Sequence, residues 1–240
     1  MTTQLADWLE AYLARTRELA TVFFAVVPLV LIYGLGLTLA APWARSGVDL
    51  ISGRLLTELS TTTYIAIQCA IAIALVALAI DRRQRTVREH LRWAVPSIVE
   101  ACLWGLTLGG IVLTLMDEVR LLSTTSTTGT SELTISLMDR VVISAGAGLH
   151  EELLFRAFAV PLISLLLSRA IGVPKSAAAI GAIIISSLAF SSAHHLAGEP
   201  FSAFVFSYRL VAGFVFAALF LWRGFAITAW AHAAYDFSVI

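Results

Sequence analysis

Charged side chains are scarce in this chain of 240 residues. Asp, Glu, Lys and Arg make up 13% of it, whereas about 25% is usual for a soluble domain. The 16 cationic residues are balanced by 16 acidic ones, so the charge gives no reason to propose nucleic acid or an anionic surface as a partner. Apolar residues reach 59%. This composition excludes an ordinary soluble domain and indicates an integral membrane protein.

Cysteine is scarce as well. The two cysteines, Cys69 and Cys102, lie inside apolar runs, where they are expected to pack as small side chains. They exclude a disulfide framework and a cysteine-rich metal cluster. Neither has a nearby base, and the chain has no Gly-rich phosphate loop and no serine nucleophile elbow. The common soluble hydrolase and nucleotide-binding motifs are therefore missing.

Long apolar runs dominate the chain instead. A spanning helix needs about 20 mainly apolar residues. The stretch 133–168 is too long for one span, so we expect a surface-lying lead-in followed by a spanning helix. The other candidate spans are 19–41, 62–80, 93–116, 176–194, 201–222 and the shorter 225–239. The sequence predicts an all-α fold, a polytopic membrane bundle of about seven or eight helices in a single integral domain, 1–240. No cleavable signal peptide is evident.

The charges of the loops predict an orientation. The loop 81–92 carries five Arg and two acidic residues, which places it in the cytoplasm by the positive-inside rule. Alternating from there, Glu151 lies early in an inward-running helix, and His194 and His232 lie late in two outward-running helices. These three residues are therefore predicted at a similar depth, displaced toward the outer half of a cell membrane.

The first polar cluster, His150 to Arg156, contains two adjacent carboxylates in an apolar run. Residues four apart share a helix face, so Glu152 and Arg156 are expected to form an ion pair while Glu151 faces elsewhere. A carboxylate in a poorly solvated cavity can act as a general base near neutral pH. The alternative is a purely structural buried network.

Two later clusters could supply partners for Glu151. Phe190 and His194 share a helix face, and His195 points elsewhere; a histidine at a helix end can also be a simple interfacial residue. His232 and Asp236 share a face too. They could form an oriented imidazole, a pair aimed at an oxyanion, or a stabilising pair near the chain end.

Zinc coordination by the first helix alone is excluded. His150-Glu151 begins a zinc protease motif, but Leu154 occupies the position of the second histidine. A divalent metal, zinc in particular, held by Glu151, His194 and His232 together with a water remains chemically possible.

Taken together, the three clusters resemble the motifs of the CPBP family, which comprises the CaaX prenyl endopeptidases and related bacterial bacteriocin-processing or self-immunity proteins. The resemblance covers Glu151 to Asp236, within a family-like core of about 133–240. The matching residues are Glu151, Glu152 and Arg156, then Phe190 and His194, and then His232 and Asp236.

The resemblance implies a helix bundle that encloses a polar intramembrane cavity and cleaves peptide bonds within the membrane. It implies that Glu151 activates water, that His194 positions this water or assists proton transfer, and that His232 and Asp236 stabilise the oxyanion. Both metal-dependent and metal-free versions are open. The CaaX endopeptidases carry Asn where this chain has Asp236, and an ionised Asp cannot donate to an oxyanion. Asp236 is thus either protonated or orients His232.

The leading hypothesis is an intramembrane endopeptidase that acts on a membrane-associated peptide or protein and has membrane lipid as its surroundings. One alternative is a catalytically silent membrane protein that binds a peptide or partner, such as an immunity protein. Another is a small transporter with Glu151, Arg156 and Arg209 in its path. The absence of recognisable inverted repeats weighs against the transporter.

Overall fold

The computed structural model describes residues 2–40, 62, 66, 86–120, 135–196 and 200–240. Within these residues the chain is helical and contains no strand, which confirms the all-α prediction. The helices are α1 (Thr2–Arg15), α2 (Leu19–Gly36), α5 (Val87–Arg120), α6 (Leu137–Gly146), α7 (Val160–Arg169), α8 (Lys175–Leu196), α9 (Ala203–Arg223) and α10 (Phe225–Val239), with the π-helical segments η1 (Ala147–Glu151) and η2 (Leu153–Ala159) between α6 and α7.

Four helices among the described residues are long and apolar enough to cross a membrane. They are α2, the Val87–Val112 part of α5, α8 and α9. The predicted span 62–80 lies outside the described residues except for Thr62 and Ala66, so the number of helices in the whole chain stays a prediction. Large apolar side chains point outward from these four helices, for example Leu31, Leu103 and Ile184. Such side chains fit a bundle whose outer surface faces lipid.

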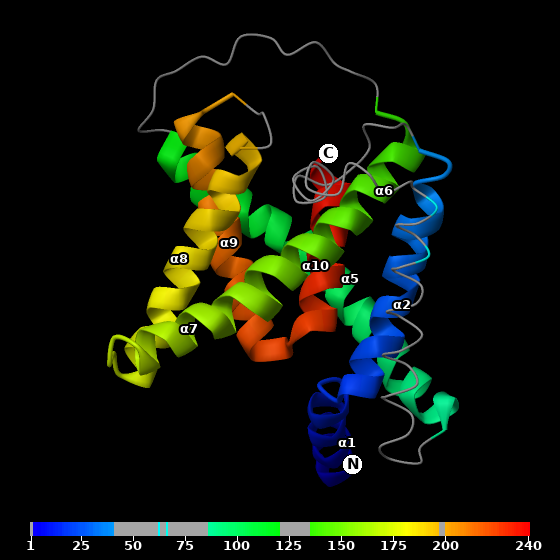
Figure 1. Cartoon of the computed structure of the whole chain (residues 1–240). Helices are drawn as coiled ribbons and strands as arrows, with labels where there is room; N and C mark the ends of the chain where they lie inside the picture. Colours follow the sequence, from blue (N-terminus) through cyan, green and yellow to red (C-terminus); the bar gives the residue numbers. More distant parts are fainter. Residues whose placement is uncertain (1, 41–61, 63–65, 67–85, 121–134, 197–199) are drawn as a thin grey trace.

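The basic ends of the helices gather on one side. In Figure 1, α1, the start of α5, the α7–α8 turn and the α9–α10 turn all lie at the lower end of the bundle. These segments carry several cations, among them Arg88, Arg92, Arg169, Lys175 and Arg223. The basic ends of these described helices thus lie on one side, and the orientation of the protein in a membrane stays a prediction.

The segment that holds the two glutamates differs from the prediction. The expected surface lead-in followed by a separate helix is wrong, because one unbroken helical run extends from Leu137 to Arg169. A run of this length reaches up to about 50 Å, which is more than the hydrocarbon thickness of about 30 Å. It fits because it crosses the bundle obliquely to α2 and α8 (Figure 1). A stretch of this length is too long for one span only when the helix lies close to the membrane normal.

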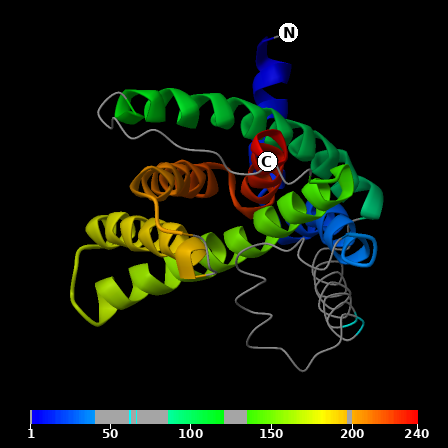
Figure 2. The ribbon, with the colours of Figure 1, turned by 90° about the horizontal axis from the view of Figure 1, so that it is seen from above.

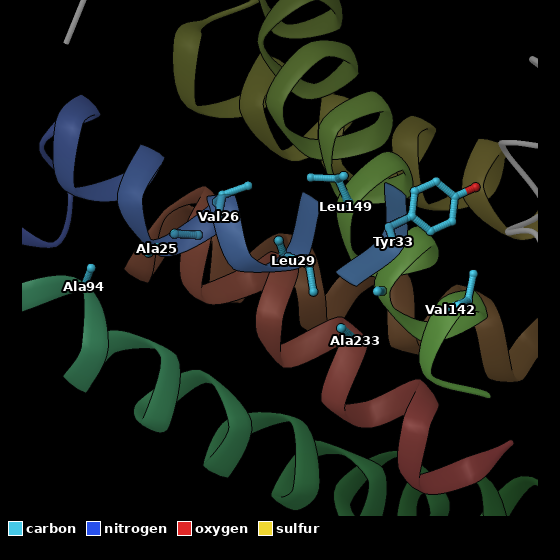
Figure 3. Close-up of a cluster of buried hydrophobic side chains, with 11 residues drawn as sticks. Ala25, Val26, Leu29, Tyr33, Ala94, Val142, Leu149 and Ala233 are labelled. Carbon is cyan, nitrogen blue, oxygen red and sulfur yellow. The ribbon is translucent and has the colours of Figure 1, made fainter. Parts of the chain in front are cut away.

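Helix α10 lies inside the bundle. Seen from above, it is enclosed by α5, the oblique helix and α9 (Figure 2). One apolar core joins α10 to α2, α5 and α6, and Figure 3 shows its members Leu29, Tyr33, Val142, Leu149 and Ala233. A second core joins α10 to α5 and α9 through Leu108, Phe216, Ile227 and Tyr235, among others. The inner helix is therefore fixed on both sides.

A glycine brings η1 against α10. A Cβ atom at Gly148 would overlap the carbonyl oxygen of Ala229 and lie 2.8 Å from the backbone nitrogen of Ala233. The two backbones can approach this closely because Gly148 has no side chain. The contact sets the distance between Glu151, at the end of η1, and the middle of α10.

Candidate active site

The two glutamates lie where the oblique helix widens into π-helical turns. Glu151 ends η1 and Glu152 separates it from η2, and their exposed fractions are 2% and 0%. A π-helical turn contains an additional residue, so side chains leave the regular helical faces, and such turns are frequent at functional sites. Here they direct two neighbouring carboxylates into the protein interior, where each needs a compensating partner.

Glu152 has two positively polarised partners. Arg156 Nη1 lies 3.0 Å from Glu152 Oε1, so the predicted ion pair is present. His232 Nδ1 lies 2.7 Å from the same oxygen. Arg156 also donates from Nη2 to the carbonyl oxygen of Gly213, at 3.3 Å, and its guanidinium lies over the ring of Phe190, 4.4 Å from the centroid. Glu152 is therefore a structural anchor for a guanidinium and an imidazole.

The anchor determines how His232 is oriented. Because an ionised carboxylate only accepts hydrogen bonds, the short contact with Glu152 places a proton on Nδ1 of His232. The opposite nitrogen, Nε2, then lies 3.9 Å from Glu151 Oε2 and 3.6 Å from Asp236 Oδ2. The ring of Phe216 stacks on the imidazole, with centroids 4.4 Å apart. His232 is thus held on three sides and presents one nitrogen to Glu151.

His194 approaches Glu151 from α8. Its Nδ1 donates to the carbonyl oxygen of Phe190 at 3.0 Å, since a carbonyl oxygen accepts. Its Nε2 lies 3.9 Å from Glu151 Oε2, and its ring meets the edge of Phe190 at a centroid distance of 5.2 Å. The side chain of His194 is 17% exposed, whereas that of Glu151 is 2% exposed. His194 is therefore the more exposed of the two side chains.

One carboxylate oxygen is consequently near two imidazole nitrogens. Oε2 of Glu151 is 3.9 Å from Nε2 of His194 and 3.9 Å from Nε2 of His232. These separations are too long for direct hydrogen bonds. Two hydrogen bonds of about 2.8 Å that meet at a water span about 4.0 Å at an angle of about 90° and about 4.6 Å at the tetrahedral angle. The spacing therefore leaves room for a water near the carboxylate and each imidazole.

The same spacing is less suited to zinc. Nitrogen and oxygen ligands at about 2.0–2.1 Å from a tetrahedral zinc lie about 3.4 Å from one another. The separations of 3.9 Å from Glu151 to the two histidines exceed this value. Among the described residues, no group of three or more His, Cys, Asp or Glu side chains is arranged to hold a metal ion. The donor types suit zinc, and their present separations from Glu151 are about 0.5 Å wider than those expected of zinc ligands.

His195 lies apart from this cluster. Its ring packs against Phe201 and Phe206, with centroid distances of 5.2 Å and 6.0 Å. These aromatic residues lie at the start of α9 and just before it. His195 thus contributes to the contact between the end of α8 and α9, while its neighbour His194 turns toward Glu151.

Three features of the site were not evident from the sequence. The spacing argument paired His232 with Asp236 and did not foresee the closer contact with Glu152. Phe216 and Gly213, both on α9, contact His232 and Arg156, yet they lie in an ordinary apolar run. No sequence signal distinguishes them, because their roles arise from packing between helices distant in the chain.

Residues 134–238, less than half of the chain, match the model of a family described as type II CAAX prenyl endopeptidase, Rce1-like. Comparison with curated proteins and with solved structures gives no match. The matched region contains all three motifs and every residue of the cluster around Glu151. The family resemblance read from those motifs is confirmed.

Proposed function

We propose that the protein is an intramembrane endopeptidase in which Glu151 activates water, from the premise that residues 134–238 match the Rce1-like model of the type II CAAX prenyl endopeptidases. The family is a protease family, so hydrolysis of a peptide bond in a membrane-associated substrate is the expected reaction. The observation that carries the residue assignment is the position of Glu151 Oε2, 3.9 Å from Nε2 of His194 and 3.9 Å from Nε2 of His232.

The proposed reaction begins with a water at Glu151. The carboxylate accepts one proton as the water oxygen attacks the scissile carbonyl carbon, which gives a tetrahedral oxyanion. When this intermediate collapses, the C–N bond breaks and the proton held by Glu151 passes to the leaving amine. One water is consumed, and a new carboxyl group and a new amine are released.

The two histidines have different roles in this proposal. With its proton on Nδ1, neutral His194 offers Nε2 as an acceptor for the second proton of the water, which fixes the direction of attack. His232, when also protonated on Nε2, donates to the developing oxyanion. Asp236 faces that same nitrogen at 3.6 Å, so we assign it an orienting role for His232. This assignment removes the need for a protonated Asp.

Glu152, Arg156 and Phe190 support the reacting groups. Glu152 holds His232 by Nδ1 and Arg156 by its guanidinium. Phe190 lies between Arg156 and His194, since its ring contacts both side chains. A displacement of any of the three would move an imidazole relative to Glu151, and a shift of about 1 Å at a catalytic group can reduce the rate about 100-fold.

The separations around Glu151 favour the metal-free version of the reaction. A zinc-dependent version needs His194 and His232 to move closer to Glu151. The cleavage rate after treatment with a chelator distinguishes the metal-free version from the zinc-dependent one. A catalytically silent binding or immunity protein is the second candidate. It does not need a carboxylate buried between two oriented imidazoles, an arrangement that is costly inside a membrane.

The function is tested by comparing the membrane peptidome of cells that carry the wild-type protein or Glu151→Gln. Peptide ends produced only by the wild type are expected, because Gln cannot accept the proton of water. Glu10→Gln is the matched control, since Glu10 is exposed on α1, and it should give the wild-type pattern. Identical peptidomes for the wild type and Glu151→Gln, at equal protein levels, would contradict the proposal.

A further inference from the structure

A cavity separate from the cluster around Glu151 lies where α1, α2 and α5 meet, and charged side chains are part of its lining. Its volume is about 190 Å³, and it is lined by residues of α1, of the start of α2 and of the start of α5. None of the residues assigned to the reaction lines it. Among those that do are Arg15, Glu18, Thr21, His90, Arg92 and Trp93.

The cavity is located at the level of a membrane interface. The spans of α2 and α5 both begin beside it, at Leu19 and Val87. An aromatic group stands at the same place: the ring of Trp8 stacks on Tyr12 at 5.2 Å, and Trp93 lies 6.0 Å from Trp8. Tryptophan and tyrosine are enriched where a membrane meets water. The cavity is thus at the depth of the lipid headgroups.

A buried histidine leaves one nitrogen available in this cavity. His90 is 3% exposed, its ring stacks on Phe24, and its Nδ1 lies 3.1 Å from the hydroxyl of Thr21. Its Nε2 has no hydrogen-bond partner within the described part of the chain. When the Thr21 hydroxyl donates to Nδ1, Nε2 carries the proton and can donate to an anionic oxygen.

Arginine adds positive charge beside His90. The guanidinium of Arg92 lies over the ring of Trp93, 5.3 Å from its centroid, and it has no carboxylate partner among the residues that the structure describes. Arg15 is paired with Glu18 at 2.9 Å, but its guanidinium has five N–H donors and only one of its nitrogens is used there.

Two carboxylates, those of Glu18 and Glu89, also line the cavity, and both already accept hydrogen bonds within the protein. Glu89 accepts from the backbone N–H of Thr86 at 2.9 Å, so it caps the start of α5. At the start of α2, Glu18 makes no side-chain cap, which leaves the first backbone N–H groups of that helix for another acceptor. Helix N-termini carry partial positive charge.

From these contacts we infer that the cavity binds the phosphate of one membrane phospholipid, through Arg92, His90 and Arg15. A lipid fits better than free phosphate because exposed apolar side chains flank the lining residues: Leu13 on α1, and Leu91 and Val95 on α5. They provide a surface for the acyl chains. In the predicted orientation the lipid belongs to the cytoplasmic leaflet.

Binding can be measured on the full-length protein purified in a non-ionic detergent. The protein is titrated with dihexanoylphosphatidylglycerol in one arm and inorganic phosphate in the other, with native mass spectrometry and Trp fluorescence as readouts. One lipid per protein is expected to bind. Arg92→Gln should weaken this binding by at least about tenfold, because a charged hydrogen-bond donor is lost.

Arg88→Gln is the matched control. Arg88 is exposed one helical turn before Arg92 and carries the same charge, but it does not line the cavity. Its affinity for the lipid should equal that of the wild type, and all proteins should unfold at the same temperature. An equal loss of lipid affinity in Arg88→Gln and Arg92→Gln would show that binding depends only on general surface charge, and it would overturn the inference. Equally tight binding of inorganic phosphate would overturn the assignment to a lipid.

Discussion

At the scale of single residues, the two neighbouring glutamates have different surroundings. Glu152 contacts Arg156 and the protonated nitrogen of His232, so its charge is compensated where it is buried. Glu151 has no such close partner: its nearest imidazole nitrogens are 3.9 Å away. One carboxylate is thus fixed in the structure, and the other is placed to hold a water.

Replacing Glu152 should therefore affect stability first. Glu152→Gln leaves the buried guanidinium of Arg156 without its counter-ion, and removal of one partner of a buried pair destabilises by about 3–5 kcal/mol. Unfolding in a graded mixture of mild detergent and dodecyl sulfate measures this loss. The double variant Glu152→Gln with Arg156→Met is expected to recover part of it. A single variant as stable as the wild type would show that the pair does not contribute.

The orienting role of Asp236 gives a different expectation. Asp236→Asn keeps an acceptor oxygen near Nε2 of His232, so the cleavage rate should stay within about tenfold of the wild type, whereas Asp236→Leu should lose much more, in the range of about 10²–10⁴ that acid–base positioning supplies. Initial rates on one substrate identified from the peptidome compare the variants. A rate for Asp236→Asn as low as that for Asp236→Leu would contradict the orienting role.

At the scale of helices, the site depends on the close approach of η1 to α10. Gly148→Ala places a methyl group against the backbone of Ala229 and Ala233, which should force the helices apart and separate Glu151 from His232. We expect a loss of about 1–3 kcal/mol in stability, as for other overpacked sites, together with reduced cleavage. The measurements are unfolding in mixed detergent and the initial rate.

Gly34→Ala in α2 is the control for this variant. A Cβ atom at Gly34 has no neighbour within 4 Å, so the same chemical change inside a helix should leave stability and rate near those of the wild type. If Gly148→Ala behaved like Gly34→Ala, the close contact between η1 and α10 would not determine the site.

The sequence predicted contacts within one helix better than contacts between helices. Spacing within one helix identified the Glu152–Arg156 pair and the three polar clusters, because residues four apart meet whatever surrounds them. It did not predict the π-helical turns or the contact between Glu152 and His232. Those depend on how the oblique helix packs on α10, and sequence spacing within one helix carries no information about a partner 80 residues away.

At the scale of the whole molecule, composition was sufficient to predict the fold class. Few charges and long apolar runs indicate a membrane protein, and helices satisfy all backbone hydrogen bonds inside a membrane. The steep tilt of the Leu137–Arg169 run was not predictable, because apolar length alone does not fix a tilt angle. Packing against α8 at one end and α2 at the other determines it. The tilt is what carries Glu151 to the crossing point with α10.

The central claim is that Glu151 activates a water held between His194 and His232. Its most direct test is the cleavage rate of purified protein after treatment with 1,10-phenanthroline, with the metal content measured in the same sample. The metal-stripped wild type should keep its full rate, and Glu151→Gln should be slower by about 10²–10⁴-fold while unfolding at the wild-type detergent ratio. Persistent activity in Glu151→Gln, or activity that returns to the stripped wild type only with zinc, would contradict this account.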